Sequence, residues 1–286
     1  MPETPELHAH AERLSASYAG SLLERFDVLS FTVLKTYRPS PDVAVGEPLL
    51  AVERYGKYLA LRFPSVSHVV HLMQGGRLRP GASTARKPKG GLVRWSFEGG
   101  GRLLLTEPGT EHRVGVWAVE GDPAEAEPLS ALGPEATSLE PDALADRLRA
   151  PSARLHTALR DQRRLAGLGR RLANEVCHRA GLSPFVSTGS LDDPAISRVA
   201  EAIAACVGES LEEERARGEF GGAGDRTNAV HGRTGHRCPV CGDVVREVAY
   251  NAYTVHYCAA CQTGGKVLAD NTLSKLGIER GPVVQD

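Results

Sequence analysis

The spacing of hydrophobic residues changes twice along this chain and divides it into three kinds of structure. In residues 5–19, apolar side chains recur every three or four positions, a spacing that predicts a helix. From residue 27 to residue 119 they fall in short runs rich in β-branched and aromatic residues, separated by glycine and proline, which predicts strands. From residue 142 onward the helical spacing returns.

The middle region predicts an all-β sandwich or barrel of about seven to eight strands, because short strands follow one another at regular intervals. We expect these strands at residues 29–34, 43–54, 58–63, 68–73, 92–97, 102–106 and 114–119. In the third region we expect helices at residues 142–148, 152–160, 169–180 and 193–217, and a short final helix at residues 267–276.

Four of the six cysteines have the spacing of a metal site. Cys238, Cys241, Cys258 and Cys261 form the pattern C-x2-C-x16-C-x2-C. In a chain without a secretion signal this pattern predicts one structural Zn²⁺ in a tetrahedral site. The alternatives are two C-x2-C pairs that occur by chance and a redox site. The segment around them, residues 231–265, therefore reads as a zinc ribbon built on a β-hairpin.

Residues 120–142 are rich in proline, glutamate, alanine and serine and mark a domain boundary. The predicted fold class is α+β with two domains, an N-terminal β-sandwich with an N-terminal helix and a C-terminal helical domain that ends in the zinc-ribbon hairpin. The expected divisions are residues 1–125, 126–230, 231–265 for the zinc finger and 266–286 for a C-terminal tail.

The composition restricts the class of protein only weakly. With 286 residues and 41% hydrophobic residues the chain can bury a sizeable core. It has no run of the roughly 20 apolar residues that a membrane span needs and no signal peptide, so we expect a soluble, cytoplasmic protein without a membrane partner. The formal net charge of −1 does not indicate nucleic acid, but residues 151–182 hold seven arginines against two carboxylates. That segment is either an anion-binding face or an arginine-rich solvated surface.

The N-terminus carries a possible nucleophile. Removal of Met1 would leave Pro2 with a free secondary amine, which can attack a carbon of carbonyl character and form an iminium. An α-amino group titrates near pH ~8, so part of it is unprotonated at neutral pH. Glu3 beside it can move protons. Alone, the same six residues also fit a solvated tail.

Several stretches, in this order and spacing, resemble the Fpg/Nei family of bifunctional DNA glycosylases over nearly the whole chain. Those in the N-terminal half are Pro2-Glu3-Thr4-Pro5-Glu6, Gly56-Lys57-Tyr58-Leu59, and His71-Leu72 with Gly76-Arg77-Leu78. The family's helix–two-turn–helix is matched by Asp161-Gln162, Ala166-Gly167-Leu168-Gly169, Ala173-Asn174-Glu175 and Arg179-Ala180-Gly181. Its terminal zinc finger is matched from Gly232-Arg233 through the four cysteines to Gln262.

The resemblance implies a base-excision-repair DNA glycosylase with AP-lyase activity. Its partner would be double-stranded DNA with a damaged base or abasic site, bound by a monomer associated with the nucleoid. The damaged nucleotide leaves the base stack, Pro2 attacks its C1′, and the strand breaks by β-elimination or β,δ-elimination. Glu3 matches the general acid/base and Glu6 its support, while Lys57 matches a phosphate-holding lysine beside the active site. His71 either approaches DNA or is a core histidine.

The DNA-binding positions depart from the family pattern. Arg170 stands where the family has the asparagine of Gly-Ile-Gly-Asn, and Tyr253 stands where the zinc finger has an arginine. We expect Arg170 to take over the charge of that arginine. The residues matching those that fill the space of the extruded nucleotide are Gln74, His112 or Arg113, and Val114. The lesion preference should therefore differ from that of a typical 8-oxoguanine enzyme.

The remaining DNA-binding predictions are Arg163, Arg164, Gly169 and Arg171, and the glycine-rich residues 218–225 match the family's loop over the extruded base. Two alternatives to the enzyme stay open. One is a damaged-DNA-binding relative with weakened catalysis, favoured by the two altered phosphate ligands. The other is a zinc-ribbon nucleic-acid binder without a base-excision role, which the N-terminal match disfavours.

Overall fold

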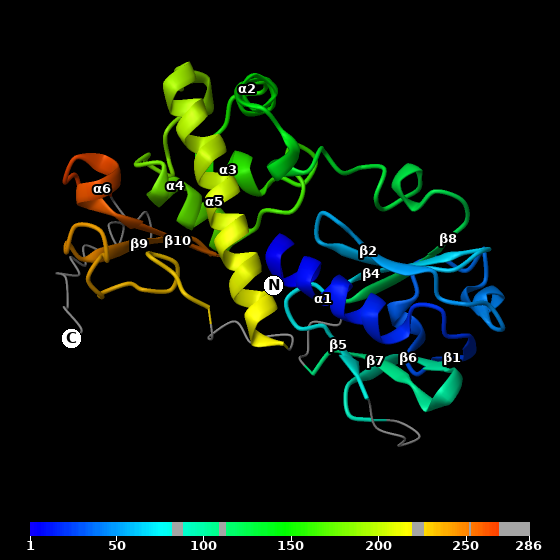
Figure 1. The fold of residues 1–286 in the computed structure, drawn as a ribbon. Coiled ribbons are helices and arrows are strands. Elements are labelled where there is room, and N and C mark those ends of the chain that lie inside the picture. The colour runs from blue at the N-terminus through cyan, green and yellow to red at the C-terminus, as the bar shows by residue number, and fades with distance from the viewer. Residues whose placement is uncertain (82–87, 109–112, 219–225, 252, 269–286) are drawn as a thin grey trace. The chain divides into compact units, whose positions relative to one another are not determined.

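The computed structural model describes residues 1–81, 88–108, 113–218, 226–251 and 253–268 (Figure 1). The chain forms two compact units. The first contains Met1–Leu132 and Glu214–Ala223, and the second contains Gly133–Glu213 and Gly224–Asp286. His112 and residues 219–225, which carry two of the predictions above, lie outside the described residues.

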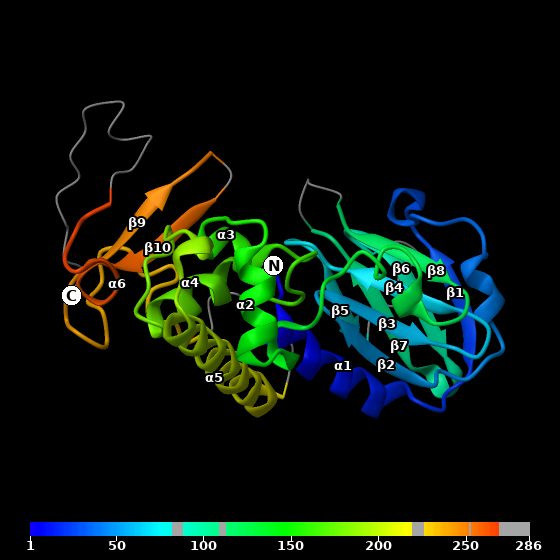
Figure 2. The ribbon, with the colours of Figure 1, turned by 90° about the horizontal axis from the view of Figure 1, so that it is seen from above.

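The first unit is a β-sandwich with one helix, α1 (Thr4–Tyr18), packed along it (Figure 2). Both sheets are four-stranded and antiparallel. One sheet has the order β2 (Ala51–Tyr55), β3 (Tyr58–Arg62), β4 (Ser67–His71) and β8 (Gly115–Val119). The other has the order β1 (Leu23–Val28), β6 (Gly91–Phe97), β7 (Arg102–Thr106) and β5 (Arg77–Pro80).

On one face of the β2–β3–β4–β8 sheet, Ala60, Val69 and Val119 are buried in a small cluster with Leu129. The side chains that the two sheets turn toward each other form a larger hydrophobic layer between them. That layer also takes in the apolar stripe of α1, and its members include Leu7, Leu14, Leu59, Leu61, Val70, Trp95, Leu103, Leu105 and Val116. The predicted β-sandwich and N-terminal helix are confirmed.

A buried histidine lies inside this layer with both ring nitrogens bonded. The indole N–H of Trp95 donates to Nδ1 of His68 at 2.9 Å, and Nε2 of His68 lies 2.9 Å from the carbonyl oxygen of Pro41. Nδ1 must therefore be the acceptor and Nε2 the donor, which is the neutral imidazole. Burial lowers the pKa of His68 to about 4.

Two strand predictions in this unit were wrong. Residues 29–34 contain a 3-10 turn, Phe31–Val33, in which Phe31 is 73% exposed, and the strand precedes it as β1. The polar outward side chains of β1, Arg25 and Asp27, hid it from a search for apolar runs. Residues 43–54 form a strand only at the end, as β2, and β5 was missed because it is four residues long.

The second unit is helical and ends in a two-stranded hairpin. Its helices are α2 (Pro141–Arg149), α3 (Leu155–Arg160), α4 (Arg170–Arg179), most of α5 (Asp193–Arg217) and α6 (Ala259–Thr263). The hairpin pairs β9 (Val245–Ala249) with β10 (Thr254–Cys258) in antiparallel register. The core joins leucines of α2, α3 and α4 to Ile196, Val199 and Ile203 of α5, and Cys177 is fully buried in it.

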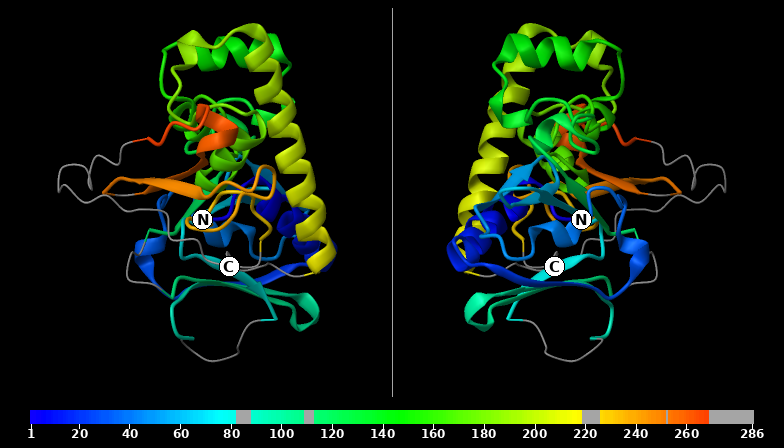
Figure 3. Two further views of the ribbon diagram at one scale, coloured as in Figure 1. Left: turned by 90° about the vertical axis from the view of Figure 1, so that its left-hand side faces the viewer. Right: turned by 90° about the vertical axis from the view of Figure 1, so that its right-hand side faces the viewer.

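The helical predictions held for α2, α4 and α5, while α3 begins at Leu155, three residues later than expected. The short helix α6 inside the predicted ribbon was not expected. Of the predicted helix at residues 267–276, only Val267 and Leu268 are described, and neither is helical. The last turn of α5 belongs to the first unit and lies beside α1 (Figure 3). There Arg215 pairs with Glu12 of α1 at 2.5 Å.

Short 3-10 turns also occur at Pro41–Ala44, Glu98–Gly100, Pro123–Glu125, Ala136–Ser138 and Thr188–Ser190. Among the described residues, none of the helices has both the length and the apolar character that crossing a bilayer requires.

Candidate functional site

The residues at the N-terminal end of α1 include the predicted nucleophile and its acid, both in buried positions. Glu3 is the N-cap of the helix and 3% exposed, and Glu6 is 1% exposed. The carboxylate of Glu6 accepts the backbone N–H of Glu3 at 2.7 Å, and the carboxylate of Glu3 accepts the backbone N–H of Glu6. This reciprocal capping box orders the two carboxylates. Pro2, the residue before them, is buried as well, so the solvated-tail interpretation does not describe this terminus.

Lys57 and His71 lie next to each other on the β2–β3–β4 sheet. Lys57 occupies the two-residue turn between β2 and β3, in which Gly56 has φ 52°, a value that favours glycine. His71 lies across from Tyr58, with ring centroids 4.4 Å apart. Burial first, and then the positive charge of Lys57, lower the pKa of His71 to about 4. The lysine is 5% exposed, so a charged ammonium is held in a largely desolvated position.

The segments predicted to fill the space of an extruded nucleotide meet at a residue that sequence reasoning missed. Glu107 is 3% exposed, and its carboxylate accepts the backbone N–H groups of Arg113 at 3.1 Å and Val114 at 3.3 Å. A Cβ at Gly75 would lie 3.3 Å from Cγ of Glu107, so the loop that carries Gln74 packs against the same side chain. Gln74 and Arg113 are exposed, while Val114 is buried in the sandwich core.

In the second unit, Gln162 shapes the turns that lead into α4. Its amide nitrogen donates to the carbonyl oxygens of Arg160 and Leu168 at 2.9 and 2.8 Å. Its amide oxygen accepts the N–H of Gly167, which has φ 99°. Gly169 is then the N-cap of the ten-residue helix that begins at Arg170.

The arginines predicted to bind DNA differ in their surroundings. Arg163 is exposed and Arg170 is half-buried at the first position of α4. Arg164 donates to the carbonyl oxygen of Leu148 at 2.9 Å. Arg171 is 5% exposed and donates to the hydroxyl of Ser210 at 3.2 Å. The local positive charge is therefore distributed between surface and interior.

The four predicted metal ligands cluster at the base of the hairpin. The Sγ atoms of Cys238 and Cys261 are 3.9 Å apart, and those of Cys241 and Cys258 are 3.4 Å apart. Sulfur atoms around a tetrahedral Zn²⁺ with bonds of ~2.3 Å lie about 3.8 Å from one another, so the donor set fits such an ion. Burial raises the pKa of the Cys258 thiol to about 11, and a bound cation would favour the thiolate. No disulfide links the described cysteines.

One face of α4 ties the helix to this cluster. Nε2 of His178 lies 3.3 Å from Sγ of Cys238, and the ligand atoms of His178, Cys238, Cys258 and Cys261 all lie within 4.8 Å of one another. One turn earlier, the carboxylate of Glu175 accepts three consecutive backbone N–H groups, those of residues 229–231, at 2.7 to 3.1 Å. Sequence reasoning missed His178, although Asn174, Glu175 and His178 form a polar stripe at helical spacing.

Tyr253 lies near the tip of the hairpin against an arginine of the preceding helix. Cζ of Arg160 is 4.0 Å from the centroid of the Tyr253 ring. The ring of Tyr250 stacks on Tyr253 with centroids 4.9 Å apart. Sequence reasoning did not single out Arg160, because 93 positions separate it from Tyr253 and no motif connects them.

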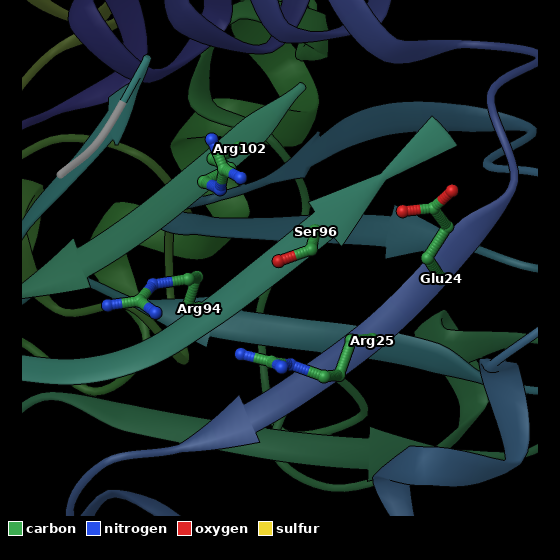
Figure 4. Close-up of a pocket in the computed structure, with 5 residues that line it drawn as sticks. All are labelled: Glu24, Arg25, Arg94, Ser96 and Arg102. Carbon is green, nitrogen blue, oxygen red and sulfur yellow. The ribbon is translucent and has the colours of Figure 1, made fainter. Parts of the chain in front are cut away.

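A pocket of about 310 Å³ lies on the outer face of the β1–β6–β7 sheet, and none of the predicted site residues lines it (Figure 4). Its lining residues are Glu24, Arg25, Arg94, Ser96 and Arg102. Arg25 donates to Asp27 at 2.7 and 3.0 Å. Asp27 and Glu24 oppose two of the three arginine charges, so the pocket keeps little net charge for an anion.

Comparison with known proteins gives one consistent result. The family profile for the formamidopyrimidine-DNA glycosylase N-terminal domain matches residues 1–114. The formamidopyrimidine-DNA glycosylase of Symbiobacterium thermophilum is 31% identical over 277 residues, which cover 92% of this chain and 89% of that protein. An uncharacterized formamidopyrimidine-DNA glycosylase-like protein of Mycobacterium tuberculosis is 38% identical over 148 residues, 51% of this chain and 94% of that protein.

Solved structures agree with the sequence relatives. MutM (Fpg) from Thermus thermophilus superposes with a TM-score of 0.78 at 28% identity, covering 91% of this chain and 98% of that one. A Lactococcus lactis FPG mutant in complex with Fapy-dG-containing DNA superposes with a TM-score of 0.81 at 21% identity, covering 92% and 100%. With identity of this level over nearly its full length and the same two-part fold, the chain belongs to the formamidopyrimidine-DNA glycosylase family.

Proposed function

We propose that this protein is a base-excision-repair DNA glycosylase with AP-lyase activity and that Pro2 is its nucleophile. The observation that carries the proposal is the ordered, buried start of α1, where Pro2 precedes two carboxylates of a capping box. A disordered terminus would rarely place the Pro2 nitrogen next to a bound sugar, whereas an ordered terminus lowers the entropy cost of the attack. Relatives of the same fold have been solved with abasic-site DNA.

The proposed reaction needs only groups of the first unit. After removal of Met1, the Pro2 nitrogen attacks C1′ of the extruded nucleotide and loses its proton, and the C1′–N bond to the base breaks as the base takes up a proton. The C1′–O4′ bond of the sugar then breaks as O4′ takes up a proton from Glu3, which leaves a C1′=N⁺ iminium on Pro2. The resulting iminium draws electrons from C2′, so a C2′ proton leaves and the bond to the 3′-phosphate breaks. Glu3 supplies and removes protons at the sugar. Glu6 supports Glu3 through the capping box, and Lys57 offers a desolvated positive charge to a phosphate.

The second unit would bind the DNA. The N-cap glycine of α4 and Arg170 present backbone N–H groups and a positive charge at a helix N-terminus, which favours a phosphate. We propose Zn²⁺ as the metal of the four cysteines, with a purely structural part. We also propose that Gln74 and Arg113 occupy the space left by the extruded nucleotide. There they would contact the base that has lost its partner and the strand that carries it.

Trapping with borohydride tests the nucleophile. The metal-loaded protein, with removal of Met1 verified by mass, is mixed with duplex DNA containing an abasic site, and borohydride reduces any iminium to a stable protein–DNA adduct. The matched control retains one extra N-terminal residue, so that the Pro2 nitrogen is an amide while every side chain is kept. We expect an adduct with the mature protein and none with the control.

A second candidate is a damaged-DNA-binding relative with weakened catalysis, which the uncharged Tyr253 at the finger position favours. This candidate predicts binding to abasic-site DNA by both forms and an adduct with neither. An adduct with both forms would place the nucleophile on an amine other than that of Pro2 and would contradict the role of Pro2.

A further inference from the structure

Two arginines and two tyrosines form a stack beside the hairpin tip, which we call the arginine–tyrosine stack: Arg154, Arg160, Tyr250 and Tyr253. Tyr250 and Tyr253 flank the turn between β9 and β10, and the N–H of Tyr250 donates to the carbonyl oxygen of Tyr253 at 2.8 Å. Their rings are nearly parallel, at 18° and 4.9 Å between centroids. The turn therefore holds both rings in one orientation.

The two arginines come from the ends of α3. Arg160 is the last residue of that helix, and its guanidinium lies over the Tyr253 ring at 4.0 Å. Arg154 is the N-cap residue, donates to the hydroxyl of Tyr250 at 2.9 Å, and lies over the Phe185 ring at 5.5 Å. Cation–π contacts of this kind hold a guanidinium by its face and leave N–H groups pointing outward in its plane.

The stack keeps its positive charge. Within the described part of the chain, no carboxylate lies within 4.0 Å of Arg154 or Arg160. The nearest acidic neighbour in sequence, Asp161, accepts the backbone N–H of Arg163 through Oδ1. Arg154 is exposed, and Arg160, Tyr250 and Tyr253 are half-buried. The stack thus places two guanidinium groups on a rigid aromatic support, and Nη1 of Arg160 is a buried donor without a hydrogen-bond partner among the described residues.

We infer that Arg160, held on Tyr253, binds a backbone phosphate of DNA and supplies the positive charge that Tyr253 itself lacks. The guanidinium fork matches the oxygens of a phosphate. Stacking of a base on Tyr253 is disfavoured because Arg160 and Tyr250 already lie against its ring. The inference rests on the proposed function only in taking DNA as the ligand. It also replaces Arg170, which we expected to supply this charge, with an arginine that contacts Tyr253.

The test measures binding of the full-length, metal-loaded protein to a duplex that carries a tetrahydrofuran analogue of an abasic site. The analogue cannot form an iminium, so binding is read separately from catalysis. Fluorescence anisotropy gives the Kd over a range of KCl concentrations. Arg160→Gln should weaken binding about tenfold at low salt and reduce the slope of log Kd against log salt by about 0.9, the value for one phosphate contact.

Matched variants separate the stack from general charge. Arg147→Gln removes the same charge from an exposed position of α2 and should leave the salt slope unchanged. Tyr253→Phe keeps the ring and should bind within about twofold of wild type. Tyr253→Ala should weaken binding and, combined with Arg160→Gln, should add little further loss, because both changes remove one interaction.

Arg160→Lys keeps the inference testable if Arg160→Gln disturbs the fold, which metal content and thermal unfolding will show. The lysine retains the charge, so the salt slope should return to the wild-type value. An unchanged slope in Arg160→Gln, or an equal effect of Arg147→Gln, overturns the inference. A folded Arg160→Lys variant whose salt slope is as low as that of Arg160→Gln also overturns the inference.

The outcomes distinguish this inference from the proposed catalysis. Suppose that the salt slope for binding the analogue depends on Arg160 but that no borohydride adduct forms. The phosphate site at Arg160 is then supported and the role of Pro2 as nucleophile is contradicted. If an adduct forms but the salt slope does not depend on Arg160, the role of Pro2 is supported and the phosphate site at Arg160 is contradicted. Absence of any binding by the wild-type protein overturns the phosphate site.

Discussion

The start of α1 and the tip of the β9–β10 hairpin serve one proposed reaction but have diverged from the family pattern to different degrees. At the start of α1, Pro2, Glu3 and Glu6 keep the expected residue types in an ordered capping box. At the hairpin tip, an aromatic residue replaces the expected arginine and an arginine of α3 lies against it.

The difference follows from what each region must do. Attack on C1′ needs one particular atom in one place, so few substitutions preserve it. Phosphate binding needs positive charge and N–H donors at roughly the right position, and a guanidinium can reach that position from more than one element. A binding surface can therefore exchange residues across a contact while the reacting groups stay the same.

The largest expected effect is at the start of α1. Glu3→Gln should slow excision of a damaged base about 100-fold or more, because general acid–base catalysis contributes about that much. The amide oxygen of glutamine can still accept the Glu6 N–H, so the free energy of unfolding should change by less than about 1 kcal/mol. Single-turnover excision on a lesion that the wild-type protein removes, together with urea unfolding, measures both quantities. Glu125→Gln, at an exposed position, is the control. If Glu3→Gln excises the base at the wild-type rate, Glu3 serves only as the cap of the helix.

Removal of the metal should affect the β9–β10 hairpin and leave the first unit unchanged. A chelator should weaken DNA binding about 100-fold by unfolding the hairpin, because structural zinc commonly contributes the folding energy of such a domain. Both tryptophans of the chain, Trp95 and Trp117, lie in the first unit, so tryptophan fluorescence should stay unchanged. Zinc should restore binding. Metal-free protein that binds DNA normally would contradict the structural role of the cysteine cluster.

Acid should instead weaken the first unit. The pKa of His68 is about 4 in the folded protein against 6.5 for an ordinary histidine, so the folded state disfavours the proton. This contribution to stability is complete above pH ~6.5 and is lost as the pH falls toward 4. Between pH 7 and pH 4.5 the loss of this contribution should lower the free energy of unfolding by about 2 kcal/mol. Urea unfolding followed by tryptophan fluorescence measures this change.

The matched variants isolate that contribution, since His10 and His71 also have pKa values lowered to about 4 by burial. His68→Gln should flatten the pH dependence by the stated amount, and His8→Gln, at a partly exposed position of α1, should not. Equal pH dependence in all three proteins would show that His68 is not the acid-sensitive group.

The smallest expected effect concerns the link between α4 and the cysteine cluster. His178→Phe should lower metal affinity about tenfold, because side chains that hydrogen-bond a metal ligand typically contribute this much. Competition with a chromophoric chelator measures the affinity. His178→Gln, which retains an N–H donor, should lie closer to wild type. An affinity unchanged by His178→Phe would remove this link.

Local patterns determined much of the molecule. Neighbouring residues were enough to recognise the zinc-ligand spacing and to predict the helices α1 and α4. They were also enough to predict the strands β3, β4, β6, β7 and β8, which are short runs rich in β-branched and apolar residues. The family motifs then indicated Pro2, Glu3 and Lys57 as candidates. Local reading failed for β1, whose outward face is polar, and for β5, which is too short to show a period.

Contacts between distant residues were decided by the tertiary structure alone. Arg160 meets Tyr253 across 93 positions, and His178 meets Cys238 across 60. Glu107 gathers the amides of Arg113 and Val114 without any motif around it. The sequence by itself therefore determined the elements and the candidate chemistry, because periodicity and ligand spacing are local properties. Which arginine lies on Tyr253 depends on how α3 packs beside the hairpin, and no local pattern records that.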